Sequence, residues 1–289
     1  MSEFNKYRSI YSYDELMERL RNLRHIALDM DGTIYMGMSL FPYTKAFLKS
    51  VKDMNINYSF LTNNPSKSLD DYLKKLAKLG IEASEEEMYT TVIATIDYIH
   101  KFYPNAKNLF LLGTPSMISQ FESAGFRSTA DDADDVPDII VAAFDMSLVY
   151  PRLCRAAWWI SQGVPYIATN PDRVCPTDQR VVLVDCGSIC ACLTHATGRK
   201  PDIVLGKPDP NMLSGIMTRY GLQPEQVAMV GDRIYTDVET AHNAGSFGVL
   251  VLSGETTLEI ADQSPKQPHL ICDSIEVLGE LIREAHGLK

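Results

Sequence analysis

Short, nearly continuous apolar runs recur along this chain, and segments with helical spacing separate them. The runs are HIALD, YSFLT, NLFLLG, DIIVAAF, PYIAT, RVVLV, QVAMVGD, FGVLVL and HLIC. A strand that is apolar at nearly every position suits a parallel sheet buried on both faces, rather than a sheet with one wet face. The alternation therefore predicts an α/β fold, in which a parallel sheet is flanked by helices and joined by right-handed crossovers.

The segments between the runs carry helix signals. In SLDDYLKKLAKLG the apolar residues from Leu69 to Leu79 recur at helical spacing, and Gly80 is placed to end that helix. Ser84, with Glu87 three residues later, predicts a capping box. A further helix is expected from Tyr13 to Leu23, in an N-terminal extension to which the sequence assigns no role.

Composition excludes several classes of protein. The 289 residues include 27 basic and 37 acidic side chains, for a net charge of −10, which argues against a nucleic-acid partner. No stretch approaches the roughly 20 apolar residues that span a bilayer, so no membrane partner is expected. The six cysteines show no CxxC pairing, and the N-terminus lacks an apolar signal segment. We therefore expect reduced thiols and a cytoplasmic protein.

Polar side chains follow three of the apolar runs and one further apolar run, DIVL, at the point where each run ends. They are Asp29 and Asp31, then Thr62 and Asn63, then Lys207, and finally Asp232 and Asp237. In an open parallel sheet, ligands bind beyond the carboxyl ends of the strands. We therefore expect all four groups at one edge of one sheet.

Such a set of groups predicts phosphoryl chemistry. Several ionised carboxylates in a small pocket repel one another unless a cation lies between them. Mg²⁺ is a hard cation that prefers carboxylate oxygens, water and substrate phosphate. Lys207 and the Thr62 hydroxyl then supply donors for an anion held beside the metal. An attacking carboxylate and a phosphate repel each other, and the positive charges of the metal and Lys207 offset this repulsion.

Four motifs extend this interpretation. DMDGTIY, LTNNPS, LGKPDP and MVGDRIYTDV, in this order, resemble the motifs of the haloacid dehalogenase (HAD) superfamily of phosphatases, and most closely its NagD-like, p-nitrophenyl-phosphatase-like branch. The resemblance implies a Rossmann-like core, an aspartyl-phosphate mechanism and Mg²⁺ as cofactor. Asp29 matches the nucleophile, Asp31 the general acid and base, and Lys207 the cation that neutralises the phosphoryl group. The implied metal ligands are Asp29, Asp31 through its backbone carbonyl, and Asp232.

The resemblance also assigns the neighbouring residues. Thr62 and Asn63, together with Lys207, match the phosphate and substrate donors. Asp237 matches a carboxylate that supports the metal ligands without binding the metal. The residues that would line the site beside Asp232 are Arg233, Ile234, Tyr235 and Thr236.

The long gap between Thr62 and Lys207 contains its own strand–helix alternation. We therefore predict a catalytic core at residues 1–90 and 202–289 and a second α/β domain at residues 91–201, which matches the large cap of the NagD-like branch. In VDCGS, Asp185 and Cys186 precede Gly187 where the branch usually has a Gly-small-Gly turn, so the sequence departs from the branch pattern here. Cap residues that follow strands are candidates for substrate contact: Asp145, Tyr150, Asn170 and Arg173. In this branch dimers often form through the cap, so a homodimer is a family expectation.

The predicted function is a Mg²⁺-dependent phosphomonoesterase for small soluble phosphate esters, such as sugar phosphates or nucleoside monophosphates, with p-nitrophenyl phosphate as a test substrate. A phosphomutase of the same superfamily is one alternative. A non-catalytic phospho-aspartate regulatory protein is another, which Asp31 disfavours because it would give the intermediate a built-in hydrolytic base.

Overall fold

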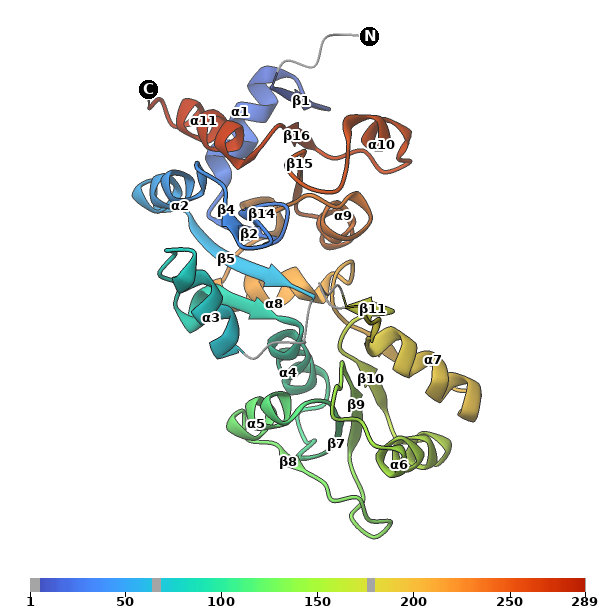
Figure 1. The fold of residues 1–289 in the computed structure, drawn as a ribbon. Coiled ribbons are helices and arrows are strands. Elements are labelled where there is room, and N and C mark those ends of the chain that lie inside the picture. Colours follow the sequence, from blue (N-terminus) through green and yellow to red (C-terminus); the bar gives the residue numbers. More distant parts are fainter. Residues whose placement is uncertain (1–5, 64–68, 176–179, 289) are drawn as a thin grey trace. The chain divides into compact units, whose positions relative to one another are not determined.

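The computed structural model describes residues 6–63, 69–175 and 180–288. The chain divides into two compact units (Figure 1). The core unit comprises Met1–Thr62, Leu73–Tyr89 and Lys207–Lys289, and the inserted unit comprises Asn63–Tyr72 and Thr90–Gly206. Each unit has its own sheet, so the predicted α/β class holds for both. The predicted domain boundaries at residues 90/91 and 201/202 stay a prediction.

A seven-stranded sheet forms the centre of the core unit, in the order β1-β16-β15-β14-β2-β5-β6. From β16 to β5 the neighbouring strands are parallel, and β1 pairs antiparallel with β16 at one edge. Strand β2 lies inside the sheet, between β14 and β5, and all four of its residues are buried, as the apolar run predicts. The strands are β1 (Tyr7–Ser9), β2 (His25–Leu28), β5 (Asn57–Thr62), β6 (Met88–Thr90), β14 (Val227–Gly231), β15 (Phe247–Val251) and β16 (Leu270–Cys272).

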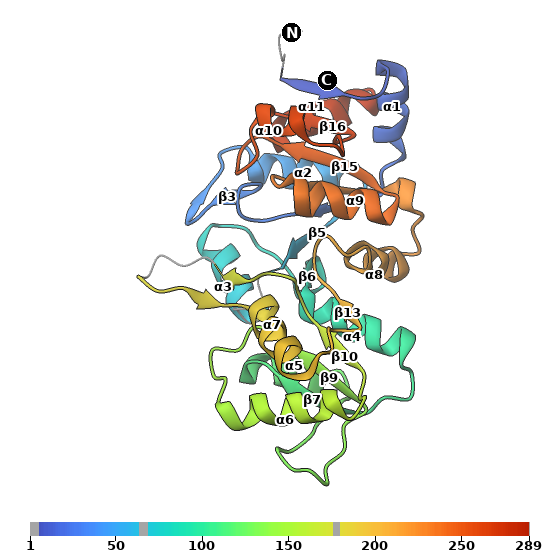
Figure 2. The same ribbon diagram turned by 90° about the vertical axis from the view of Figure 1, so that its right-hand side faces the viewer.

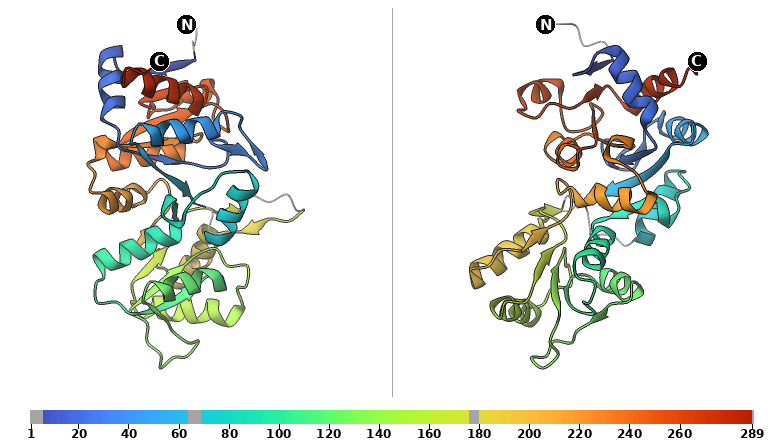
Figure 3. Two further views of the ribbon diagram at one scale, coloured as in Figure 1. Left: turned by 90° about the vertical axis from the view of Figure 1, so that its left-hand side faces the viewer. Right: turned by 180° about the vertical axis from the view of Figure 1, so that it is seen from behind.

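Helices cover both faces of this sheet. Figures 1 and 3 show α1, α2 and α11 along one side and α9 and α10 along the other. The predicted helix near Tyr13 begins at a capping box formed by Ser12 and Glu15. The α-helices are α1 (Tyr13–Asn22), α2 (Thr44–Asp53), α3 (Leu69–Lys78, shared between the units), α8 (Asn211–Tyr220), α9 (Glu239–Ala244), α10 (Leu258–Gln263) and α11 (Ile275–Ala285). Shorter elements are the hairpin β3 (Tyr35–Met36) and β4 (Ser39–Leu40), the 3₁₀ turns η1 (Glu85–Glu87) and η2 (Pro224–Gln226), and the π-helix η3 (Ile234–Val238).

The inserted unit is built on a five-stranded parallel sheet in the order β13-β10-β9-β7-β8 (Figure 2). Alternate residues of β7 face two separate cores: Leu109 and Leu111 pack in the core that includes α4 and α5, and Phe110 and Leu112 pack in the core that includes α6 and α7. Its helices are α4 (Thr91–Phe102), α5 (Pro115–Ser123), α6 (Tyr150–Ser161) and α7 (Cys186–Thr197). Its sheet strands are β7 (Asn108–Leu112), β8 (Arg127–Ser128), β9 (Ile139–Ala142), β10 (Tyr166–Ala168) and β13 (Ile203–Val204).

One predicted buried strand is wrong. The run RVVLV contributes β12 (Leu183–Val184), which pairs antiparallel with β11 (Val174–Cys175) in a separate two-stranded sheet. Val182 and Val184 are 72% and 56% exposed. A short apolar run predicts burial only where a second layer covers it, and the sequence pattern does not show which runs are covered.

The VDCGS segment, which departs from the branch pattern, folds as the start of α7. Asp185 is the N-cap and accepts a hydrogen bond from the Cys186 N–H. A β-carbon on Gly187 would overlap the Pro171 carbonyl oxygen, so the backbones approach here as closely as glycine allows. Cys186 and Cys190 are buried, whereas Cys192 is exposed.

None of the helices in the described part of the chain has the length and apolar character that a membrane-spanning segment needs.

A buried histidine in β2 leads to a pH prediction. His25 is fully buried, with its Nε2 atom 3.0 Å from the Ser59 hydroxyl. Burial, assisted by Arg219, lowers the pKa of His25 to about 4. The ordinary histidine pKa is near 6.5. When the pH falls below this value, His25 becomes protonated in the unfolded chain but stays neutral in the folded chain, so the free energy of unfolding decreases as the pH falls.

We expect the free energy of unfolding to fall by about 2 kcal/mol more in the wild type than in His25→Gln between pH 7 and pH 5. Glutamine keeps a hydrogen-bonding group for Ser59 but does not titrate. Urea denaturation at both pH values measures the difference, and all other titrating groups are common to the two proteins. Equal losses would show that His25 titrates normally in the folded chain.

Candidate active site

Asp29 lies directly beyond the carboxyl end of β2, an interior strand of the core sheet. Its N–H donates to the Val230 carbonyl oxygen of β14 at 2.8 Å, which extends the parallel pairing and fixes the backbone. Its carboxylate pairs with the Lys207 ammonium, and the two side chains are only 15% and 5% exposed. A nearly buried ion pair thus stands at the strand end where the sequence predicts a nucleophile.

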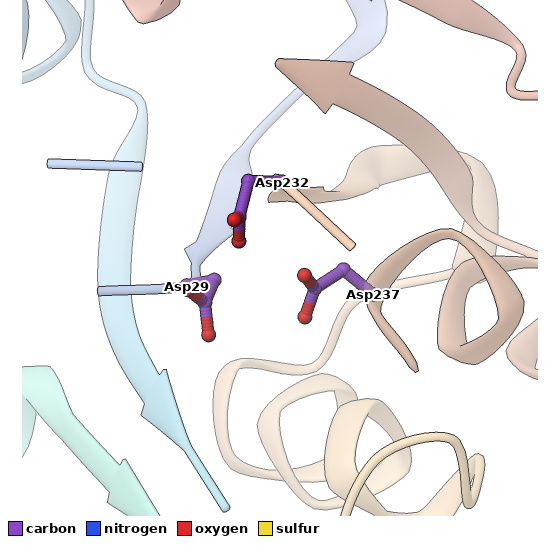
Figure 4. Close-up of side chains that lie close together, drawn as sticks. All are labelled: Asp29, Asp232 and Asp237. Carbon is purple, nitrogen blue, oxygen red and sulfur yellow. The ribbon is translucent and has the colours of Figure 1, made fainter. Parts of the chain in front are cut away.

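Two further carboxylates complete a compact cluster. Asp29, Asp232 and Asp237 each place an oxygen within 4.8 Å of the other two, and Figure 4 shows the three side chains converging. Asp232 follows β14, while Asp237 lies in the π-helix η3. The Lys207 ammonium is 2.7 Å from Asp237 Oδ1, so one cation bridges Asp29 and Asp237.

Lys207 lies at the acidic cluster as predicted, but the strand before it differs from the prediction. The run before it, DIVL, forms β13, which belongs to the sheet of the inserted unit rather than to the sheet of the core unit. The four groups therefore do not follow four strands of a single sheet. Lys207 instead begins the last segment of the core unit, just before α8, and its side chain is directed into the acidic cluster.

Burial and charge shift the ionisation of these groups. Burial raises the pKa of Asp29 to about 7, against the opposing effect of Lys207 and with the help of Asp237. Burial alone would lower the pKa of Lys207, but Asp237 and Asp29 outweigh it and raise the pKa above its ordinary value. Lys207 therefore stays charged at neutral pH, while the carboxylates hold more negative charge than one ammonium neutralises.

The oxygen atoms of the cluster fit a hard divalent cation. Both oxygens of Asp237 already have partners, Lys207 on Oδ1 and the Arg233 N–H on Oδ2 at 3.0 Å. Asp232 Oδ2 accepts from the Glu255 N–H at 2.7 Å. Asp232 Oδ1 is buried, and within the described ranges no hydrogen-bond partner reaches it. A buried carboxylate oxygen beside Asp29 with no donor is the type of ligand that Mg²⁺ takes.

Asp31 stands apart from this cluster. Its side chain is exposed, and the Gly37 N–H lies 3.5 Å from its Oδ1 atom. Gly37 is in the turn of the β3–β4 hairpin, which starts four residues after Asp31. The two aspartates of DMDGT thus have different surroundings, one nearly buried and ion-paired, the other open to solvent.

The remaining predicted residues occupy varied positions. Thr62 ends β5, the strand beside β2, and is 8% exposed; Asn63 follows it as the first residue of the inserted unit. The Ile234 side chain packs in an apolar cluster with Val238 and Leu250, so only its backbone is available to a ligand.

Arg233 and Tyr235 both contact Glu255, through an ion pair at 2.9 Å and a hydrogen bond at 2.5 Å respectively. Thr236 leaves a buried hydroxyl without a partner among the described residues. Short π-helical segments such as η3 often occur at functional sites.

One further segment of this region, residues 253–256, was not predicted from the sequence. Ser253 donates to the Gly32 carbonyl oxygen at 2.7 Å, the Glu255 N–H binds Asp232, and the Thr256 N–H donates to the Asp232 carbonyl oxygen at 3.1 Å. These residues come after β15. The rule that led to Asp29, inspection of the residues just beyond each apolar run, would have found them after FGVLVL.

Three glycines leave room for the carboxylates. A β-carbon on Gly32 or Gly254 would overlap Asp232 Oδ2, and one on Gly231 would overlap the Asp237 carboxylate. Gly32 also has a φ of +84°, which side chains rarely adopt. The backbone thus surrounds the acidic groups more closely than any other residue type would allow.

The candidate substrate residues of the inserted unit fall into two groups. Asn170 is fully buried and donates to Asp185 at 3.1 Å, while Asp145 is 7% exposed and accepts from both the N–H and the hydroxyl of Ser147. Their polar groups are used inside the unit, which favours a structural role. Tyr150 and Arg173 are exposed.

Comparisons with known proteins agree with this site. Residues 26–127 match the haloacid dehalogenase-like hydrolase family, and residues 204–278 match a HAD-hydrolase-like family. The chain is 29% identical to the ribonucleotide monophosphatase NagD of Escherichia coli (strain K12) over 253 residues, which covers 88% of this chain and 97% of NagD. It is 30% identical to the acid sugar phosphatase of Staphylococcus aureus (strain USA300) over 263 residues, with 91% and 99% of the two chains covered.

Among solved structures, a 4-nitrophenylphosphatase from Thermotoga maritima superimposes with a TM-score of 0.83 at 37% identity, covering 91% of this chain and 98% of that one. The chain belongs to the haloacid dehalogenase-like hydrolases, as a phosphatase of their NagD-like branch. The predicted family and the predicted enzyme class are thus confirmed.

The close approach at Gly254 gives a prediction. We expect Gly254→Ala to lower the phosphatase kcat/KM by roughly tenfold or more, because the added methyl group must displace the Asp232 carboxylate. Gly279→Ala, whose β-carbon would press instead on the Phe47 ring 3.0 Å away, is the matched control. Kinetics and thermal unfolding should be measured for both variants. Wild-type kcat/KM in Gly254→Ala would show that Asp232 need not keep its position.

Proposed function

We propose that the chain is a Mg²⁺-dependent phosphomonoesterase that acts on small phosphate esters through a phosphorylated Asp29. The observation that supports this most is the Lys207 ammonium bridging Asp29 and Asp237, beside the open oxygen of Asp232. The arrangement supplies a nucleophile in Asp29, a fixed positive charge in Lys207, and an oxygen of Asp232 at which a cation could add a second positive charge. Electrostatic stabilisation of the transferring group is the main need of phosphoryl transfer.

In the first step, an Asp29 carboxylate oxygen attacks phosphorus, and the bond from phosphorus to the ester oxygen breaks. The leaving oxygen takes the proton of the Asp31 carboxyl group and departs as the alcohol. Lys207 holds Asp29 in orientation and offsets negative charge as the phosphoryl group approaches. Asp31 suits the proton transfer because its side chain is exposed and lies outside the buried Asp29–Lys207 ion pair.

In the second step, water attacks the phosphorus of the aspartyl-phosphate. The Asp31 carboxylate takes a proton from that water, the bond from phosphorus to the Asp29 oxygen breaks, and inorganic phosphate leaves. Asp31 is then protonated again for the next turnover. A carboxylate nucleophile thereby divides one difficult displacement into two easier ones.

Asp29, the backbone carbonyl of Asp31 and Asp232 would hold Mg²⁺, with Asp237 supporting Lys207 and the Arg233 N–H. When bound, Mg²⁺ neutralises phosphate charge and lets Asp29 stay ionised at neutral pH. Thr62, Asn63 and the backbone of residues 233–236 are the proposed donors to phosphate.

The named relatives act on nucleotides, sugar phosphates and nitrophenyl phosphate by their descriptions, which favours small soluble esters here as well. We include residues 91–201 in the proposal as the cap that selects among them. A homodimer through the cap and a cytoplasmic location stay predictions.

We expect Asp29→Asn to lower Mg²⁺-dependent hydrolysis of p-nitrophenyl phosphate by roughly a thousandfold or more, since an amide oxygen is a poor nucleophile. Asp53→Asn, which removes an exposed carboxylate of α2, should keep wild-type rates. Circular dichroism checks the fold of both variants. Undiminished turnover in Asp29→Asn would overturn the assignment.

Reaction mixtures with a sugar phosphate as substrate separate the alternatives, because a sugar phosphate, unlike p-nitrophenyl phosphate, has further hydroxyls that could accept the phosphoryl group. Free phosphate as the product identifies hydrolysis, an isomerised phosphate ester would identify a phosphomutase, and a stable phosphorylated chain without phosphate release would identify a regulatory protein.

A second variant tests the role of Asp31. p-Nitrophenolate is a good leaving group and needs little protonation, so Asp31→Asn should retain the first step but lose the base for the second. We expect a burst of about one p-nitrophenolate per active site, followed by a steady rate lowered by roughly a hundredfold or more. Stopped-flow absorbance measures both phases. Progress that is linear from the start at the wild-type rate would exclude Asp31 as the base.

A further inference from the structure

The segment that joins β15 to α10 contacts the acidic cluster although it is neither helix nor strand. Residues 253–257 lie between these two elements, so no regular ladder of backbone hydrogen bonds fixes them. Two of its N–H groups nevertheless bind Asp232: that of Glu255 donates to Oδ2 at 2.7 Å, and that of Thr256 donates to the carbonyl oxygen at 3.1 Å. The position of the segment therefore depends on the contacts that its side chains make.

The Glu255 side chain is held at both of its oxygens. Oε2 pairs with Arg233 Nε at 2.9 Å, and Oε1 accepts a hydrogen bond from the Tyr235 hydroxyl at 2.5 Å. Burial, followed by the hydrogen bond to Glu255, raises the pKa of Tyr235 to about 12, so the phenol keeps the proton that it donates. The Arg233 guanidinium is always charged. Both contacts therefore persist at neutral pH.

These contacts connect the exposed rim of the site to its buried centre. Arg233 immediately precedes the π-helix η3, and Tyr235 lies within it. The Arg233 N–H donates to Asp237 Oδ2 at 3.0 Å, so the backbone at the start of η3 is itself bound to the cluster. A side chain held at both oxygens restricts the backbone of its own residue, which keeps the Glu255 N–H directed at Asp232.

Asp232 needs such a donor because its own side-chain torsion does not fix the carboxylate. The χ2 torsion of aspartate is broad, so the plane of the carboxylate turns about the Cβ–Cγ bond at little cost. Oδ2 faces the Glu255 N–H, while Oδ1 is buried and has no hydrogen-bond partner in the parts of the chain that are described. The donor on Oδ2 thereby determines where Oδ1 points.

We propose that Glu255 is a positioning residue for Asp232, an inference that rests on the proposed function. Its carboxylate, held by Arg233 and Tyr235, keeps its N–H on Asp232 Oδ2 and so keeps Oδ1 in place for a divalent cation. The side chains of Arg233 and Tyr235 then act through Glu255, while their backbone stays available to phosphate. Groups that orient metal ligands typically change metal affinity by about ten- to a hundredfold when they are mutated.

Binding of Mn²⁺ to the full chain without substrate tests this proposal. Mn²⁺ takes the same oxygen ligands as Mg²⁺, and electron paramagnetic resonance measures the concentration of the free ion. We expect Tyr235→Phe to raise the Kd for Mn²⁺ by roughly tenfold, because it releases one Glu255 oxygen without changing any charge. Tyr13→Phe, which removes a hydrogen bond of the same type to Glu284 at an exposed position in α1, should keep the wild-type Kd.

A second variant separates positioning from charge. Arg233→Met keeps the N–H that binds Asp237 but removes a positive charge beside the acidic cluster, which by electrostatics alone would tighten cation binding. Because the Glu255 ion pair is lost as well, we expect the Kd for Mn²⁺ to rise instead, by roughly threefold or more. In a Glu255→Ala background, Tyr235→Phe should have no further effect, since the carboxylate that the hydroxyl binds is gone.

Thermal unfolding of the same variants excludes a merely structural role. The Arg233 and Glu255 side chains are 44% and 47% exposed, and ion pairs this open to solvent contribute little to stability. We therefore expect the midpoint of unfolding to stay close to the wild-type value in Tyr235→Phe and in Arg233→Met while the Kd for Mn²⁺ rises.

Three results would overturn the role of Glu255 and leave the proposed phosphatase intact: a wild-type Kd in Tyr235→Phe, tighter binding in Arg233→Met, or an effect of Tyr235→Phe that persists in the Glu255→Ala background. A wild-type chain that binds no Mn²⁺ would instead overturn the metal-dependent function and this inference with it.

Discussion

The ammonium of Lys207 is the interaction on which the rest of the site depends. Asp29 and Asp237 approach each other only because this cation lies between them. Lys207 contacts one oxygen of Asp237, and the Arg233 N–H donates to the other. Removing a buried cation from between two carboxylates leaves an uncompensated charge, which is far more costly than losing a surface ion pair. The Lys207 side chain therefore has a structural and a chemical role. It holds Asp29, at the end of β2, close to Asp237 in the π-helix η3, and it offsets the charge of a phosphoryl group.

Backbone geometry surrounds this charge cluster. Gly32, Gly231 and Gly254 come from three separate segments of the chain, and each leaves space that a carboxylate fills. The N–H groups of Arg233 and Glu255 bind Asp237 and Asp232, so that main-chain donors orient the acids, while the side chains of Arg233 and Glu255 pair with each other. An arrangement fixed in this way needs little reorganisation when substrate binds, which is the condition for strong electrostatic catalysis.

Most of the core fold and the identity of the charged residues could be predicted from the sequence, because both obey local rules. Apolar runs located β2, β5, β14 and β15, and the residues after them included Asp29 and Asp232. Two failures share a cause, which is that the pattern along a strand does not say which sheet the strand joins. RVVLV lies in an exposed hairpin, and DIVL joins the sheet of the inserted unit. Lys207 still reaches Asp29, by a path that depends on tertiary contacts rather than on strand order.

The short strand β1 has a consequence for solubility. It pairs antiparallel with β16 and thereby occupies the outer hydrogen-bonding edge of a strand whose three residues are all buried. Only three residues long, β1 is itself a poor template for further strands. A chain cut after Tyr11 would present the bare hydrogen-bonding edge of Leu270–Cys272 to other copies of itself. The N-terminal extension thus covers a strand edge that would otherwise be open to intermolecular strand pairing and aggregation.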